Sequence, residues 1–538
     1  MSLIPQGVSP ADFAAALASF TTVVGADWVF TSDDDVGLYR DAYSPAWDEP
    51  QERRPSAALA PASVEEVQAI MRIANQYRIP VYPISTGKNL GYGGSAPTLT
   101  GAVVIDLKRM NRVIAVDDKR HFAIVEPGVS YFDLYAHIQE RGLKVWIDVP
   151  GPGWGSPVGN ALDHGLGDTW GIYRNHFSAH CGMEVVLADG TLMRTGMGAL
   201  PGSDTWAEYP YGVGASVDGL FAQSNFGIVT KMGFWLMPQP EAWCTGAITV
   251  PKRADIGPLI DFVNEIEHQG HCGEPFYSSP LAAEQGSPEW QALNAGGVFP
   301  SEEALDAFGA AKGKPWWHVR LHFYGPAEVV RAQWAAVKRM AAARIPGAAF
   351  EDGEFSPTPL PPALAQKYDP VHFGIPTLGT FALTARSDRN PNGSDGHLFF
   401  SPVIPKSGAA LLRFQRVMHQ AFRDMGEPPR IGPFTTPNTW MFHSFVVVVV
   451  FLVNRADKAV NQRLRKVFAQ LITVAAQHGW GEYRTGPLFQ DAVAATYSFG
   501  DHALMRFQEK LKDAADPNGI IAAGRYGLWP KHLREQRA

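Results

Sequence analysis

The order of apolar and polar residues in the first part of the chain predicts helices that alternate with buried strands. Residues 9–24 carry apolar side chains on one side of a helix. Ser63 and Glu66 have the spacing of a capping box at the start of a second amphipathic helix. Residues 79–84 are a continuous apolar run, which predicts a buried strand. This strand leads into a glycine-rich loop.

The pattern changes near Pro238 and Pro240, where we expect a domain boundary. Before it, strand-like segments predominate, at residues 102–107, 122–126, 144–149, 183–187 and 191–194. After it, strands alternate with long helices, at residues 258–269, 327–344, 408–425 and 461–479. Residues 445–453 are too short to span a bilayer and rich in β-branched residues, so they predict a strand buried on both faces.

Composition places the chain among globular proteins of two or three domains. It has 538 residues, of which 46% are hydrophobic and 18% charged. The net charge of −7 offers no basic surface for nucleic acid. Cys181, Cys244 and Cys272 form neither a disulfide framework nor a metal motif. The N-terminus lacks a signal-peptide pattern, so we expect a cytoplasmic protein that does not enter a membrane.

The loop at residues 85–94 is the first candidate for chemistry. It holds four glycines in eight residues, from Gly87 to Gly94. Glycine permits positive φ and close backbone approach, so successive N–H groups can surround a diphosphate. Tyr92 is the one bulky residue among these glycines, which indicates contact with a ligand. The alternative is a simple glycine-rich turn.

Two common nucleotide motifs are excluded. A P-loop requires glycine at Tyr82 and Ser or Thr at Asn89. A Rossmann fingerprint would require a third glycine at Val217, after Gly212 and Gly214, and a strand leading into the motif. The loop therefore belongs to another class of nucleotide site.

Further segments follow in a characteristic order, at residues 126–129, 159–160, 195–203, 225–230, 481–485 and 516–524. Together with the glycine loop they resemble the vanillyl-alcohol oxidase/para-cresol methylhydroxylase flavoproteins. Within that family the likeness is closest to the bacterial eugenol and vanillyl-alcohol (4-phenol) oxidases. It extends over nearly the whole chain.

The resemblance implies an α+β fold, in which a two-part FAD-binding domain of the para-cresol methylhydroxylase type receives an inserted α+β cap domain with an antiparallel sheet. The implied limits are 1–240 for the N-terminal part of the FAD domain, 241–480 for the cap and 481–538 for the C-terminal segment that completes the FAD domain and the active site. The implied cofactor is FAD, and no metal is expected. The residues implied to hold FAD are Ser85, Thr86, Gly87, Lys88, Asn89, Leu90, Gly93, Pro127, Gly128, Gly155, Ser156, Gly159, Asn160, Gly165, Ile228, Val229, His397 and Arg525.

Tyr92, Tyr483 and Arg484 match the residues that bind the substrate phenol oxygen in this family. A free phenol has a pKa of about 10, so it is mostly neutral at pH 7. A guanidinium and two hydroxyl donors would favour the phenolate, from which a benzylic hydride can leave to give a para-quinone methide. Taken alone, such a Tyr-Arg pair would more often be structural.

Two histidines are implied to act in the site. His397 matches the histidine that is joined covalently to the flavin in the oxidases of the family. His443 matches a cap-domain histidine near the substrate, although Phe442 departs from the usual Met-His-His pattern. A structural role beside a buried strand is the alternative for both.

The chain departs from the related oxidases at three positions. Gly151 stands where they carry an aspartate that is implied to assist flavin attachment and to steer water onto the quinone methide. An acidic residue near Thr380 and a tyrosine near Asp168 are also missing. Asp168 is a candidate to compensate, but the sequence does not place it. The fate of the intermediate therefore stays open.

The expected function is FAD-dependent oxidation of para-substituted phenols, either 4-alkyl- and 4-allylphenols or 4-hydroxybenzylic alcohols, with reoxidation by O2. One alternative passes the electrons to a cytochrome partner, and another oxidises non-phenolic alcohols. A third is a flavin-binding protein without catalysis, which Gly151 favours. Lignin-derived aromatics fit as substrates, and the resemblance implies a homodimer or a higher homo-oligomer.

Overall fold

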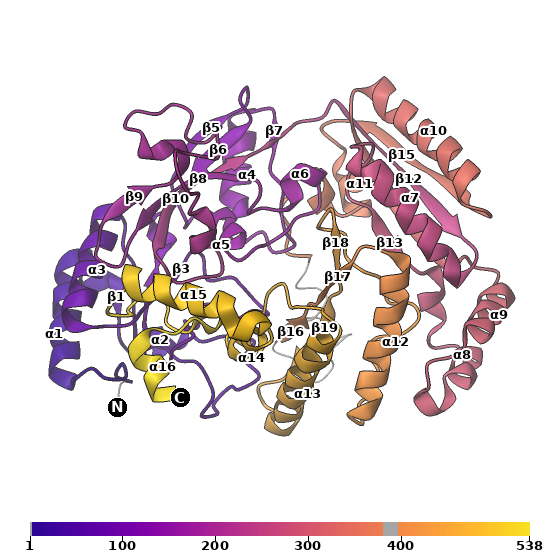
Figure 1. Cartoon of the computed structure of the whole chain (residues 1–538). Helices are drawn as coiled ribbons and strands as arrows, with labels where there is room; N and C mark the ends of the chain where they lie inside the picture. Colours follow the sequence, from indigo (N-terminus) through magenta and orange to yellow (C-terminus); the bar gives the residue numbers. More distant parts are fainter. Residues whose placement is uncertain (1–2, 380–395, 538) are drawn as a thin grey trace.

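The structure is a computed structural model that describes residues 3–379 and 396–537. Figure 1 shows two halves side by side, with the C-terminal helices (yellow) packed on the N-terminal half. The other half contains a sheet covered by long helices. This mixture of helices with largely antiparallel sheets confirms the predicted α+β fold class.

The first sheet has the strand order β1-β2-β4-β3, and its last three strands run parallel. Two of its helices start after serine caps, at Ser9 and at the predicted Ser63, whose side chains accept backbone N–H groups. Buried apolar residues of both helices pack against this sheet. The elements are α1 (Pro10–Val24), β1 (Val29–Phe30), α2 (Asp33–Gly37), β2 (Ala57–Leu59), α3 (Val64–Tyr77), β3 (Val81–Ile84) and β4 (Val103–Asp106).

The second sheet is antiparallel, with the strand order β5-β6-β10-β8-β9. Its buried face forms a separate core with α4 and α5. Ser130 and Asp133 form a capping box at the start of α4. The elements are β5 (Val113–Asp117), β6 (Phe122–Val125), α4 (Tyr131–Glu140), β7 (Val145–Trp146), α5 (Pro157–Leu162), α6 (Gly171–Arg174), β8 (His180–Val186), β9 (Leu192–Arg194), β10 (Ile228–Trp235) and β11 (Met237–Pro238).

The third sheet has the antiparallel order β13-β14-β12-β15. Strand β12 is buried along its whole length, because helices pack on the sheet and its two neighbours pair with it. The elements are β12 (Ala242–Val250), α7 (Ile256–His268), β13 (Phe276–Ser278), α8 (Pro288–Leu293), α9 (Glu302–Lys312), β14 (Trp317–Gly325), α10 (Ala327–Arg344), β15 (Ala349–Pro357) and α11 (Pro362–Lys367). The boundaries at 240 and 480 stay predictions.

The apolar run 445–453 is not one strand buried on both faces, so that prediction is wrong. The run divides between β18 (Ser444–Val446) and β19 (Val449–Val453), which pair with β17 (Val403–Pro405) and β16 (Gly396–Phe400). Burial alternates along β19, because one face lies in the core while Val450 lines a cavity. Two long helices, α12 (Gly408–Asp424) and α13 (Lys458–Gln477), complete this region.

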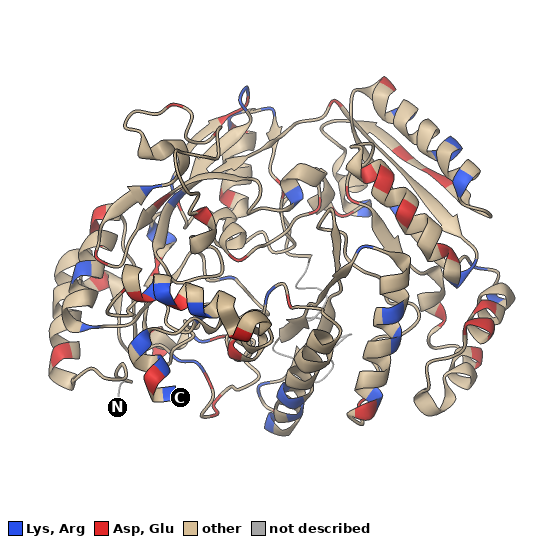
Figure 2. Cartoon of the chain, in the orientation of Figure 1, with Lys and Arg blue, Asp and Glu red and all other residues tan. Residues whose placement is uncertain are grey.

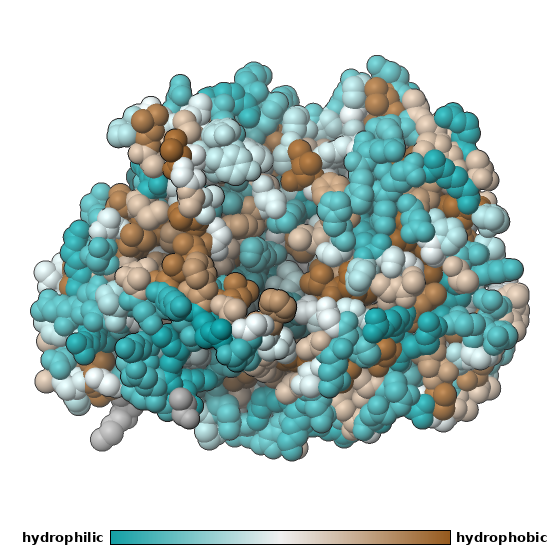
Figure 3. All heavy atoms as spheres, viewed as in Figure 1, coloured by the Kyte–Doolittle hydropathy of each residue, from teal (hydrophilic) through white to brown (hydrophobic). Residues whose placement is uncertain are grey.

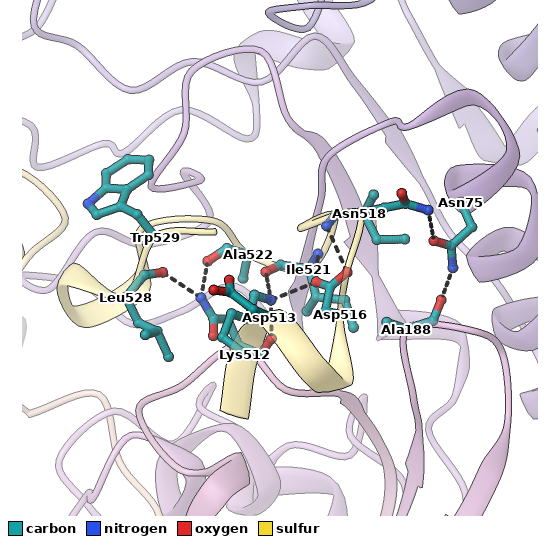
Figure 4. Close-up of polar contacts among 12 residues, drawn as sticks. Asn75, Ala188, Lys512, Asp513, Asp516, Asn518, Ile521, Ala522, Leu528 and Trp529 are labelled. Carbon is teal, nitrogen blue, oxygen red and sulfur yellow. Dashed lines mark hydrogen bonds and ion pairs between the residues drawn. The ribbon is translucent and has the colours of Figure 1, made fainter. Parts of the chain in front are cut away.

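Buried polar contacts join the C-terminal tail to the N-terminal half (Figure 4). The Lys512 ammonium donates to the carboxylate of Asp516 at 2.6 Å and to the carbonyls of Asn225 at 2.7 Å and Ile521 at 3.0 Å. The Ala522 N–H also donates to the Val81 carbonyl at 2.7 Å, which extends the first sheet. The tail comprises α14 (Gln490–Ala495), α15 (Phe499–Ala515) and α16 (Lys531–Arg537).

The surface carries charges of both signs, and Figure 2 shows acidic and basic positions on helices of both halves. Figure 3 shows hydrophobic residues gathered near the yellow helices of Figure 1, and three large side chains of α15 are exposed, namely Phe499, Leu504 and Phe507. Within the described ranges, no helix is long and apolar enough to cross a membrane, and no cluster of His, Cys, Asp and Glu has the arrangement of a metal site.

Candidate active site

A cavity of about 570 Å³ lies where the N-terminal half, the tail and the β16–β19 region meet. Its walls come from the glycine loop after β3, from residues 150–168, from the start of β10, and from β16 and β19. Because these segments are far apart in the sequence, only the folded chain creates this cavity. Figure 3 shows a recess between the two halves of the molecule.

The glycine loop forms one wall of the cavity, and residues 85–90 all line it. The N–H groups of residues 86–90 donate no hydrogen bond to any part of the chain that the structure describes. Gly87 has a φ of +66°, and a Cβ there would lie 2.3 Å from Ser95 Oγ. Such a run of unpaired amides fits an anionic diphosphate.

Most of the residues implied to hold FAD line this cavity. Three do not, and each has a packing reason to be glycine. A Cβ would meet Pro487 from Gly93, the Leu107 carbonyl from Gly128, and the Asn160 side chain from Gly165. These three glycines therefore shape the walls without lining the cavity.

Arg484 lies against the rings of two tyrosines that line the same cavity. Its guanidinium carbon is 4.1 Å from the centre of the Tyr92 ring and 5.2 Å from that of Tyr483. The Tyr92 hydroxyl is 3.3 Å from the hydroxyl of Ser401. Arg484 Nε is buried and has no hydrogen-bond partner among the described residues, so the guanidinium retains a donor for a ligand.

Burial and the neighbouring phenol raise the pKa of Tyr92 well above its ordinary value, so its hydroxyl keeps its proton. Burial alone would lower the pKa of Arg484, but Tyr483, Tyr92 and Asp163 raise it above its ordinary value. The site therefore combines a permanent positive charge with a neutral hydroxyl. This combination favours an anionic oxygen on a ligand.

Asp163 connects the glycine loop, the tail and Arg484. Its carboxylate accepts hydrogen bonds from Asn89 at 2.7 Å, Arg525 at 2.7 Å and Tyr526 at 2.9 Å, and it lies 3.7 Å from Arg484. The sequence interpretation missed this residue. A carboxylate in a glycine-rich segment was the available signal, but its partners lie more than 70 positions away along the chain.

His397 lies on β16 and is buried against the glycine loop. Its ring is 5.0 Å from that of Tyr43 and 4.2 Å from that of Phe399. A Cβ at Gly91 would lie 3.0 Å from its Cδ2 atom. Burial lowers the pKa of His397 to about 4, so the imidazole is neutral and nucleophilic at pH 7.

The remaining predicted site residues do not all lie at the cavity. Gly151 lines the cavity, as do Asp168 and Trp440. His443 does not line it, because its side chain is exposed and lies 4.6 Å from the ring of His268. Thr380 lies outside the described residues.

Comparison with known proteins identifies the class. A family model described as "FAD binding domain" matches residues 55–196. The chain is 32% identical to the 4-cresol dehydrogenase [hydroxylating] flavoprotein subunit of Pseudomonas putida, with 98% of each chain covered. It is 28% identical to 1'-carboxy-chondrochloren decarboxylase of Chondromyces crocatus, over 96% of this chain and 98% of that protein.

Two solved structures agree with these matches. The first is 4-ethylphenol oxidase from Gulosibacter chungangensis, with a TM-score of 0.81 and 34% identity over 99% of this chain and all of that one. The second is p-cresol methylhydroxylase, with a TM-score of 0.79 and 30% identity over 98% of this chain and 99% of that one. Fold and matches together define an FAD-dependent oxidoreductase. The chain belongs to the vanillyl-alcohol oxidase/para-cresol methylhydroxylase family, and its cofactor is FAD.

Proposed function

We propose that this protein oxidises para-substituted phenols at the benzylic carbon and uses O2 to reoxidise its FAD. The observation that carries the proposal is the convergence of Arg484, Tyr92 and Tyr483 on one cavity, with a guanidinium nitrogen that has no hydrogen-bond partner in the described part of the chain. Relatives named for 4-cresol and 4-ethylphenol support a phenolic substrate. FAD supplies the hydride acceptor.

The residues of the chain act on the phenol oxygen. Arg484 holds the phenolate by charge, and the two tyrosine hydroxyls donate hydrogen bonds to it. The phenolate returns electron density through the ring, so hydride loss leaves a neutral para-quinone methide instead of a cation. Gly151 contributes no group to this step. His443 has no place in the proposed mechanism, because its side chain is exposed.

Reduction by a phenol is the first test. We expect 4-ethylphenol to bleach the oxidised-flavin absorbance under anaerobic conditions, and air to restore it within seconds. A protein that only binds flavin would show no bleaching with any phenol. If the flavin absorbance recovers slowly in air and an artificial one-electron acceptor accelerates the recovery, the cytochrome-coupled alternative is favoured. The name "flavoprotein subunit" of one relative is consistent with that alternative.

We further propose that His397 holds the FAD covalently through its 8-methyl carbon, because a buried neutral imidazole lies on the cavity wall. Acid precipitation of the wild type should then keep the yellow colour in the pellet, and His397→Ala should release all flavin to the supernatant. His443→Ala is the matched control and should keep its flavin bound. Free flavin from the acid-treated wild type would contradict the proposal.

Three further expectations concern the diphosphate of FAD, the substrates and the oligomeric state. The lining residues of the glycine loop and Arg525 would hold the diphosphate end of FAD, since they line the cavity and the amides of residues 86–90 donate no hydrogen bond within the described chain. Lignin-derived aromatics stay the predicted substrates. The homo-oligomer stays a prediction, although exposed hydrophobic side chains on α15 are typical of a surface that another chain covers.

A further inference from the structure

Asp168 is a carboxylate on the cavity wall that can still accept a hydrogen bond from a ligand. Among the described lining residues, the carboxylates are Asp163 and Asp168. Asp163 is already bound by Arg525, Tyr526 and Asn89. Asp168 accepts a hydrogen bond from the Trp440 indole at 3.1 Å, which orients it without neutralising its charge.

The chain holds Asp168 beside the segment of Gly151. The N–H of Thr169 donates to the Asp148 carboxylate at 2.9 Å, and the Thr169 hydroxyl donates to it as well. A Cβ at Gly167 would collide with this same carboxylate. Residues 167–169 are therefore tied to a position three residues before Gly151, and both segments line the cavity. A carboxylate missing at 151 is thus available from the neighbouring segment.

Glu274 is a buried carboxyl next to Asp168. It is 3% exposed, and its Oε1 accepts a hydrogen bond from Thr439 at 3.2 Å. The Glu274 N–H donates to the Thr169 carbonyl at 3.3 Å, which places this residue beside Asp168. Burial raises the pKa of both carboxyls above their ordinary values, and the charge of Asp168 raises that of Glu274 further, so the pair retains a proton that the two groups share. His372 lies beside both residues: its Nδ1–H donates to the Asp168 backbone carbonyl at 2.9 Å, and the same nitrogen is 4.0 Å from Glu274 Oε2.

We propose that Asp168 is the general base that adds water to the benzylic carbon of the quinone methide, with Glu274 as its positioning residue. The inference rests on the proposed function. The water oxygen forms the new C–O bond, and its proton goes to the Asp168 carboxylate. The electron pair of the exocyclic C=C bond moves through the ring to the phenol oxygen, which Arg484 holds as phenolate. Nothing is oxidised or reduced in this step, because the hydride left earlier.

The test measures products of 4-ethylphenol, which divide between the hydrated alcohol and the alkene formed by proton loss. We expect the wild type to form alcohol whose oxygen comes from labelled water. Asp168→Asn should lower the alcohol-to-alkene ratio at least about 10-fold, since a general base typically contributes about 10²–10⁴ in rate. The exposed Asp204→Asn is the control and should leave the ratio unchanged.

A second experiment restores a carboxylate at a different position of the cavity wall. The double variant Asp168→Asn, Gly151→Asp should recover alcohol, because the base returns on the neighbouring segment. Glu274→Gln keeps a donor to Asp168 but cannot share a proton, so the pH midpoint of the product ratio should move while alcohol still forms. This variant also serves if Asp168→Asn does not fold, which its melting temperature reports.

Several results would overturn the proposal. They are a wild type that forms only alkene, an unchanged ratio in Asp168→Asn, and an unmoved pH midpoint in Glu274→Gln. Flavin bleaching is recorded in the same samples. Bleaching with an unchanged product ratio removes the role of Asp168 and leaves the proposed phenol oxidation intact, whereas absence of bleaching in the wild type removes the proposed function itself.

Discussion

Replacing Arg484 by methionine is expected to slow flavin reduction by 4-ethylphenol about 10²–10³-fold, the range seen when one donor to a developing oxyanion is removed. Methionine keeps an apolar stem of similar length but removes the guanidinium, and with it the charge and the contact with the Tyr92 ring. Asp163 keeps Arg525, Tyr526 and Asn89 as partners, so the variant leaves no isolated buried carboxylate. Stopped-flow absorbance of the flavin measures the effect.

The pH dependence of this variant has a definite sign. Without the guanidinium, the phenol must lose its proton as it does in solution, so the rate should rise with pH towards the free pKa of about 10. The wild type should depend less on pH, because Arg484 supplies the stabilisation. Arg484→Lys retains the charge without the planar fork and should lie between the two. Wild-type rates in the methionine variant would favour the non-phenolic alcohol alternative.

Replacing Lys512 by methionine is expected to destabilise the protein by about 3–5 kcal/mol, the cost of breaking a buried ion pair. The ammonium is fully buried, and its loss would leave the Asp516 carboxylate and two backbone carbonyls without this donor (Figure 4). The loss should loosen the tail, which contributes Ala522 and Arg525 to the cavity. The melting temperature and the retention of flavin report both effects.

Two controls separate charge burial from helix disruption. Lys510→Met changes an exposed lysine of the same helix and should leave the melting temperature nearly unchanged. Combining Lys512→Met with Asp516→Asn should recover part of the loss, because no buried charge then lacks its partner. A Lys512→Met protein as stable as the wild type would show that the pair does not hold the tail.

Individual helices could be predicted from patterns of residues that lie close together in the sequence. Ser63 is predicted to start a helix, and its side chain caps α3 in the structure. Helix α10 spans the predicted residues 327–344. Such features are predictable because a cap or an apolar face involves residues only a few positions apart. The ordered motifs also led to the family and the FAD cofactor, both of which the comparisons confirm.

The features that the sequence did not place all involve distant parts of the chain. The run 445–453 has the pattern of one buried strand, yet pairing with β16 and β17 divides it and turns Val450 to the cavity. His443 has the motif of a site residue but lies exposed beside His268. Asp163 draws its partners from the glycine loop and the tail. No local pattern encodes these contacts.

The sequence by itself determined the family, the cofactor and the glycine loop that can bind a diphosphate, because these depend on residue types at short, ordered spacings. The tertiary structure alone decided which of the implied residues share a cavity, and it placed Asp168 on the wall of the cavity that Gly151 also lines. The physical reason is that charge and burial act through space. A carboxylate missing from one segment can be supplied by another, and only packing determines which one.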